Sequence, residues 1–385
     1  MKKIIYIIIG VMTVIVLAFP AYAESPPENP DLLFDIDEQL DALGRDELEA
    51  QVPRETRELM RATGTDKLSV GAMLLLSPDA FFKTVAALIR EQVLQPVRTL
   101  ASIVGVIVLC ALIGALKTSS GENRISQTFS LVCVLCVLVS VITPVLDCIV
   151  ATSNSIKDTS LFMLSYIPVF AAALSASGSP ITGASYSVFL FTACQVILQL
   201  VSATLVPLMG IYLALCIMGS LIPDIDIASA TKTIKSIVSW SLGFFVTVFV
   251  GILSIQTMVA GSADTVTVRT AKFMLGSFVP VVGSALSDAY NAAQGCFKLL
   301  KTTLGAYGVV VAALTFLPVF IQTVIWYMVA NLAVIAGDIV GVKSISGMLR
   351  SCAATLGILI AIIVSFALLI IVSTTVVMMA GLGSA

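Results

Sequence analysis

The sequence predicts an all-α, polytopic membrane protein with a small helical region outside the membrane near its N-terminus. Of its 385 residues, 58% are hydrophobic and 11% are charged, and the mean hydropathy is +1.06. Soluble domains carry about 25% charged residues. Long uncharged apolar runs recur from Thr99 onward, whereas 13 of the 23 acidic residues lie between Glu24 and Asp66. This division predicts a membrane domain preceded by an acidic region.

Composition also excludes several function classes. The chain has no histidine, which removes the commonest metal ligand and the usual general base. Cys133 and Cys136 form a CxxC inside an apolar run, where we interpret them as small hydrophobic residues of a helix. HExxH, GxSxG and paired intramembrane carboxylates do not occur. We therefore assign no catalytic, cofactor-binding or metal-binding residue and expect no enzyme. The net charge of −2 argues against nucleic acid as a partner.

Residues 1–23 are predicted to be a signal peptide. Lys2 and Lys3 precede an apolar run, and Ala21 and Ala23 form an A-x-A cleavage signal just before Glu24. An uncleaved first transmembrane helix is the alternative. In both cases the segment after Glu24 is expected outside the cytoplasm.

Residues 24–98 are predicted to be an acidic and then amphipathic helical region outside the cytoplasm. Apolar residues recur at helical spacing in 31–43, where Gly44 ends the pattern, and short helices are expected over 46–51 and 54–62. Two interpretations stay open: a solvated acidic arm, or a surface that packs on a partner or on the protein's own membrane face. The segment 68–98 is expected to lie on the bilayer surface.

The next part, residues 99–155, is expected to contain two transmembrane helices, over 99–116 and 129–150. A short apolar segment over 162–175 follows. The uncharged run 186–222 is too long for one simple span, so it holds either two spans or a span and a half-helix. Further spans are expected over 234–260, 303–336 and 353–381, and the total is seven to ten crossings.

An internal duplication is predicted, with one membrane repeat over 156–263 and a second over 264–385. FMLSYIPVFAAALS at 162–175 resembles FMLGSFVPVVGSALS at 273–287, and three shorter matches follow in the same order. Four prolines at matching places are candidate positions where helices break or kink: Pro168, Pro207, Pro280 and Pro318. Paired proline-interrupted segments are typical of transporter folds with discontinuous helices. We expect the first pair to pack inside the bundle.

Polar residues within the spans are few. The candidate intramembrane positions are Gln195, Gln199, Gln256, Gln322 and Asn331. Hydrogen bonding between helices is the favoured interpretation, at about 0.6 kcal/mol each; the lining of a pathway is the alternative.

The layout as a whole resembles the stage III sporulation protein AE family of endospore-forming bacteria. The resemblance covers essentially the whole chain. It rests on the signal peptide, DLLFDIDEQLDAL, SPDAFFKTVAALIREQVLQPVRTL, the FML…PV segments and IKSIVSWSLGFFVTVFVGILSIQ. It implies a component of the channel, or feeding tube, that joins the mother cell to the engulfed forespore. It also implies other stage III sporulation membrane proteins as partners in the mother-cell membrane, with the acidic region between the two membranes.

Three hypotheses follow for function. The first is a membrane component of that channel complex, in particular its permease-like part. The alternative is an independent secondary transporter with a duplicated fold, and an intramembrane enzyme is the least favoured. The lipid bilayer is the one partner that the composition itself implies, and a homo-oligomer is among the assemblies that the sequence allows.

Overall fold

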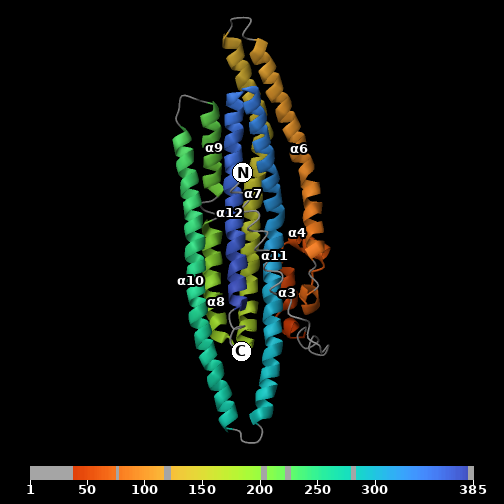
Figure 1. Ribbon diagram of the computed structural model, residues 1–385, viewed down its shortest axis with the longest axis vertical. Coiled ribbons are helices and arrows are strands. Elements are labelled where there is room, and N and C mark those ends of the chain that lie inside the picture. The colour runs from red at the N-terminus through yellow and green to blue at the C-terminus, as the bar shows by residue number, and fades with distance from the viewer. Residues whose placement is uncertain are drawn as a thin grey trace.

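A computed structural model describes residues 38–74, 78–116, 123–200, 206–221, 227–278 and 283–379. The described chain is helical throughout its length apart from short turns. Long helices lie side by side along one axis, and a group of short helices packs against their flank (Figure 1). The predicted all-α membrane fold is confirmed, because six of these helices are long and apolar enough to cross a membrane.

The chain travels up and down the bundle. In Figure 1, α6 (Pro78–Leu116) runs upward and α7 (Asn123–Ala176) returns. Two shorter helices, α8 (Pro180–Leu200) and α9 (Val206–Leu221), then follow one another in the upward direction. Finally α10 (Ile227–Phe278) descends, α11 (Gly283–Val340) ascends and α12 (Lys343–Met379) descends.

Several segments that we predicted to be separate are joined in these long helices. The expected surface segment 68–98 is divided between α5 (Val70–Leu74) and the beginning of α6, and α6, with 39 residues, continues into the first span. The segments 129–150 and 162–175 both belong to α7, which has 54 residues and a length of about 81 Å. α6 continues through Pro96 near its junction, and no glycine or proline lies between the two segments joined in α7. The described residues contain six helices of membrane length, whereas we expected seven to ten crossings for the whole chain.

The four candidate prolines have different surroundings. Because α7 and α11 continue through Pro168 and Pro318, the predicted helix breaks at these two positions are not found. Each of these prolines removes one backbone hydrogen bond, and packing of the long helices holds the rest of the ladder together. Pro207 is the second residue of α9, where a missing N–H costs little. Pro280 lies outside the described residues.

The two copies of the FML motif also lie in different settings. The first, 162–175, is the C-terminal part of α7, and most of its large side chains are buried, although Pro168 is exposed. The second begins in the last turns of α10 and continues past residues 279–282, which the structure does not describe, into α11. The duplication over 156–263 and 264–385 remains a prediction.

The acidic region folds into short helices that pack on the bundle. Helices α3 (Arg45–Ala50), α4 (Arg54–Thr63) and α5 (Val70–Leu74) lie on the flank of the bundle (Figure 1), where α4 contacts α6 and α11, α5 contacts α11, and α3 contacts α7. Gly44 and Gly64 stand in the left-handed conformation at the helix ends that the sequence predicts. The side chains of Leu40, Leu48, Val52, Met60 and Leu68 are buried. The structure thus favours packing on the protein's own membrane helices over a solvated arm.

One hydroxyl contact marks where this region meets the bundle. The Oγ1 atoms of Thr56 in α4 and Thr315 in α11 lie 2.9 Å apart and are buried. Because a buried hydroxyl needs a partner, this pair fixes the depth at which α4 sits on α11.

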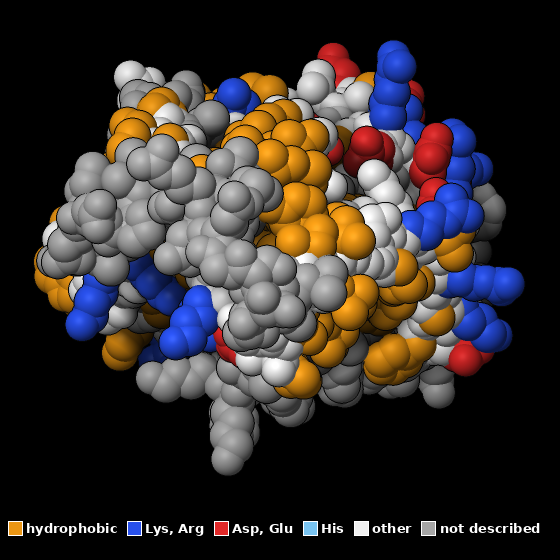
Figure 2. All heavy atoms as spheres, turned by 90° about the horizontal axis from the view of Figure 1, so that it is seen from above, with side chains coloured by type: hydrophobic (Ala, Val, Ile, Leu, Met, Phe, Trp, Pro, Cys, Tyr) orange, Lys and Arg blue, Asp and Glu red, His pale blue; other side chains and the backbone are white. Residues whose placement is uncertain are grey.

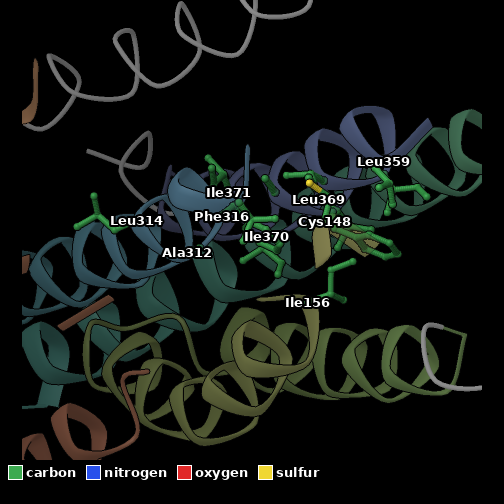
Figure 3. Packing of buried hydrophobic residues seen from close by; sticks show 14 of the residues in the cluster. Cys148, Ile156, Ala312, Leu314, Phe316, Leu359, Leu369, Ile370 and Ile371 are labelled. Atoms are coloured by element: carbon green, nitrogen blue, oxygen red, sulfur yellow. The ribbon is translucent and has the colours of Figure 1, made fainter. Parts of the chain in front are cut away.

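The core of the bundle is built around α12. This helix packs along α11 and also contacts α7, α9 and α10. Figure 3 shows the interlocking side chains, which come from α7, α11 and α12. Its labelled members are Cys148, Ile156, Ala312, Leu314, Phe316, Leu359, Leu369, Ile370 and Ile371. The central position of α12 explains why this apolar helix is buried on most of its circumference.

The two ends of the bundle differ in charge. The ends of α6, α9 and α11 and the beginnings of α7, α10 and α12 meet at the upper end in Figure 1. The basic residues in or next to these three connections are Lys117, Arg124, Lys232, Lys235, Lys343 and Arg350. Seen from this end, Figure 2 shows broad hydrophobic surface between a small group of Lys and Arg side chains and a larger group in which Asp and Glu lie among Lys and Arg. The α7–α8 turn at the other end, 177–179, has no charge.

Candidate functional site

The polar residues that we predicted within the spans do not form a common site in the described structure. Gln195 and Gln199 are exposed on α8, so they do not line the interior. Gln256 and Gln322 are partly buried, and the Oε1 atom of Gln256 is buried without a hydrogen-bond partner. Asn331 donates a hydrogen bond of 2.7 Å from Nδ2 to the carbonyl of Tyr327 in its own helix.

A buried carboxylate that the prediction missed holds the beginning of α8. Asp264 on α10 is only 4% exposed. Its Oδ1 accepts a hydrogen bond from the backbone N–H of Ile181 and its Oδ2 from that of Thr182, both at 2.9 Å. Because Pro180 has no N–H, these are the first two free donors of α8. The carboxylate therefore caps α8 from a neighbouring helix and also interacts favourably with the helix dipole.

A buried lysine completes this charged cluster. Lys301 on α11 is 2% exposed and lies close enough to Asp264 and Lys298 for charge–charge interactions with both. A buried ammonium group is costly unless a counter-charge compensates it, and Asp264 supplies one. We define Asp264, Lys301 and the N-terminus of α8 as the buried charge site. It joins α8, α10 and α11.

Next to this site, aromatic rings from α7 run along the interior. Phe162, Tyr166 and Phe170 recur every four residues, and their neighbouring ring centroids lie 5.7 and 5.3 Å apart. Phe170 contacts Tyr186 of α8 edge-on at 5.4 Å, and Phe162 lies 6.5 Å from Tyr307 of α11. We call these five residues the aromatic spine. Ring pairs at such distances add about 0.5–1.5 kcal/mol each beyond their buried area.

The spine is attached to α11 by one hydrogen bond and by a close approach. The hydroxyl of Tyr166 donates to the carbonyl of Leu304 at 3.0 Å. Gly308 lies one turn further along α11, and a Cβ atom there would be 2.5 Å from Cζ of Tyr166. Glycine is therefore required for the ring to lie flat against α11. Since Leu304 follows Lys301 by one turn, the spine and the buried charge site are adjacent.

A tight turn places α8 against the end of α7. Gly178 has φ 85°, and the N–H of Ser179 donates to the carbonyl of Leu174 at 3.0 Å. A Cβ atom at Gly183 would lie 2.8 Å from the carbonyl oxygen of Ala171. The small residues Ala171 and Gly183 thus permit close packing of α7 and α8.

The sequence does contain a signal for the buried charge site. Asp264 is the one charged residue between Lys235 and Arg269, and no charge follows Lys301 until Asp338. Such isolated charges beside long apolar runs are candidates for functional positions. Lys298 and Lys301 both belong to the continuous α11.

In chemical terms the buried charge site is a carboxylate and an ammonium group held beside a helix N-terminus. The described residues contain no group of three Cys, Asp or Glu side chains that could hold a metal ion. This arrangement connects α8, α10 and α11 through charged groups. A movement of one of these helices therefore changes the electrostatic environment of the groups on the other two.

Comparison with known proteins decides the family. A sequence model described as stage III sporulation protein AE matches residues 65–381. The chain belongs to the stage III sporulation protein AE family. Stage III sporulation protein AE of Bacillus subtilis (strain 168) is 23% identical over 235 residues, which are 61% of this chain. The match spans 59% of the length of that relative. No solved structure matches the chain. As a member of this family the protein has a role in sporulation, and the matched region contains the buried charge site and the aromatic spine.

Proposed function

We propose that this family member is the multi-pass subunit of the channel complex between mother cell and forespore, and specifically its permease-like part. The observation that carries the proposal is the family match over 65–381, which covers all six membrane-length helices. The other stage III sporulation membrane proteins are its proposed partners. Its proposed location is the mother-cell membrane that surrounds the forespore.

The charge asymmetry of the bundle supports an orientation. Six basic residues lie in or beside the α6–α7, α9–α10 and α11–α12 connections; at the other end Arg269 and Lys272 lie at a similar distance from the α10–α11 connection, and the α7–α8 turn has no basic residue near it. Cytoplasmic loops carry an excess of Lys and Arg. We assign the first end to the mother-cell cytoplasm. Because α6 begins at the opposite end, the short helices α3 to α5 then belong to the space between the two membranes, where they would meet partner proteins.

A genetic experiment tests this function. Deletion of the gene in its host is expected to block spore formation after engulfment and to leave vegetative growth unchanged. A copy of the gene at another chromosomal position, expressed in the mother cell, should restore heat-resistant spores, whereas expression in the forespore alone should not. Normal spore yield in the deletion strain would contradict the proposal.

The buried charge site favours a second candidate function, an independent secondary transporter. Charged residues inside a helical bundle often mark ion or substrate pathways. Uptake by proteoliposomes that contain this protein alone, lost in a Lys301→Met variant, would support transport. Strict dependence of any uptake on other sporulation proteins would instead support a subunit of a complex.

A further inference from the structure

An apolar groove opens on the surface of the bundle between α8, α10 and α12. Its volume is about 240 Å³. The side chains of Phe249, Phe366 and Leu369 form a buried floor, and the more exposed side chains of Val196 and Phe245 form the rim. An extended hydrocarbon chain, which is apolar along its whole length, matches this apolar lining.

One stripe of α10 leads from the groove to two positive charges. Lys235, Leu242, Val246 and Phe249 are spaced by seven, four and three residues, so they lie on one face of the helix. The last three line the groove. Lys232 stands one turn before Lys235, and both lysine side chains are exposed. The groove and the two charges are thus parts of one continuous surface.

The spacing along α10 matches the depth of a lipid leaflet. No charged residue occurs between Lys235 and Asp264, so Lys235 marks the point where α10 enters the apolar phase. Leu242, the first groove residue, lies about 10 Å deeper at 1.5 Å per residue. One leaflet contributes about 15 Å of the hydrocarbon core. An acyl chain whose headgroup is at Lys235 therefore reaches the groove directly.

We propose that this groove binds an acyl chain of an anionic glycerophospholipid whose phosphate contacts Lys232 and Lys235. The apolar lining supplies the site for the chain, and the lysines supply the preference for a negative headgroup. The site belongs to the leaflet at the end of the bundle that carries the α9–α10 connection. It does not depend on the role of the protein in sporulation.

The opposite face of α10 provides an internal control. Trp240 is 69% exposed and stacks on Phe244 at 5.3 Å between ring centroids. Neither residue lines the groove. A tryptophan at position 240 therefore reports on ordinary surrounding lipid, while one at position 245 reports on the groove, because Phe245 is 49% exposed on its rim.

Tryptophan quenching by brominated lipids tests the proposal. The full chain with W240F, W326F and F245W is reconstituted with phosphatidylcholine and phosphatidylglycerol, one of which carries dibrominated acyl chains. A second protein with W326F alone keeps Trp240 as its reporter. Near position 245, phosphatidylglycerol should be preferred by about fivefold for each contacting lysine. Near Trp240, the two lipids should quench equally.

Matched variants distinguish the contribution of the headgroup charge from that of the acyl chain. K235Q should reduce the preference at position 245 by about fivefold, whereas K343Q, at the same end of the bundle but on α12, should not change it. A193L, which fills part of the groove, should reduce quenching by both lipids. Equal quenching by both lipids at position 245 would overturn the proposal. So would the absence of quenching there, because it would show that protein covers the groove.

Discussion

Single glycines decide how closely the helices of this bundle approach one another. At Gly308 the space that a Cβ atom would need is occupied by the ring of Tyr166, which is rigid and buried. At Gly305 the corresponding space holds the end of the flexible Met378 side chain. The cost of adding a methyl group should therefore differ between two positions that are less than one turn apart.

We expect Gly308→Ala to destabilise the purified protein by about 1–3 kcal/mol, because the aromatic spine must shift to accept the new methyl group. Thermal unfolding in detergent measures the effect. Gly305→Ala should cost less, since Met378 can change its rotamer. Gly251→Ala, in α10 where nothing lies within 4 Å of the added atom, is the matched control and should leave stability unchanged or slightly raised.

The buried charge site makes a second prediction at the residue scale. Asp264→Asn removes a buried negative charge that interacts with the Lys301 ammonium group and weakens the cap of α8, so we expect a loss of about 3–5 kcal/mol. Lys301→Met should also destabilise, because Asp264 then lacks its partner. The double variant should lose less than the sum of the two single losses.

An exposed ion pair provides the control for these single and double variants. Arg350 donates to Asp338 at 2.8 Å on the protein surface. Asp338→Asn should change stability by at most about 1 kcal/mol. If the losses of the two single variants add up in the double variant, and each is as small as that of Asp338→Asn, the two buried groups do not interact.

At the scale of the elements, α7 connects many parts of the molecule, because it contacts α3, α6, α8, α9, α11 and α12. Its upper part forms one of the expected spans, and its lower part carries the aromatic spine to α8 and α11. This lower part is the segment 162–175, which looked too short to cross a membrane by itself. Its length is explained by continuity with the preceding span, since the 54 residues of α7 form one helix.

The hydrogen bond of Tyr166 tests how the spine holds α7 to α11. Tyr166→Phe keeps the stacked ring and removes the bond to the Leu304 carbonyl. We expect a loss of about 1 kcal/mol in unfolding free energy, whereas Tyr166→Ala should cost about 3–5 kcal/mol because the ring is also lost. If both substitutions cost the same, the ring would contribute nothing beyond its hydroxyl.

Local signals were sufficient to predict some elements and not others. The bounds of α3 and α4 follow from helical periodicity and from Gly44 and Gly64, whose positive φ angles end helices without help from distant residues. The continuity of α7 and α11 through Pro168 and Pro318 depends on packing with neighbouring helices, which a pattern along one chain does not contain. Burial of Lys301 depends in the same way on Asp264, a residue of another helix.

For the molecule as a whole, the structure separates two topologies that the sequence left open. The uncharged run 186–222 could hold two spans or a span and a half-helix. In the structure α8 and α9 follow one another in the same direction and together make one passage through the bundle (Figure 1). The basic connections α6–α7, α9–α10 and α11–α12 then share one end.

Reporter fusions test this topology in cells. With the beginning of α6 outside the cytoplasm, two crossings place Ser179 outside and five place Gly341 inside. Alkaline phosphatase fused after Ser179 should be active, and green fluorescent protein fused after Gly341 should fluoresce. If α8 and α9 each crossed the membrane, every later connection would change sides. Phosphatase activity after Gly341, together with activity after Ser179, would therefore reject the single passage and with it the shared basic end.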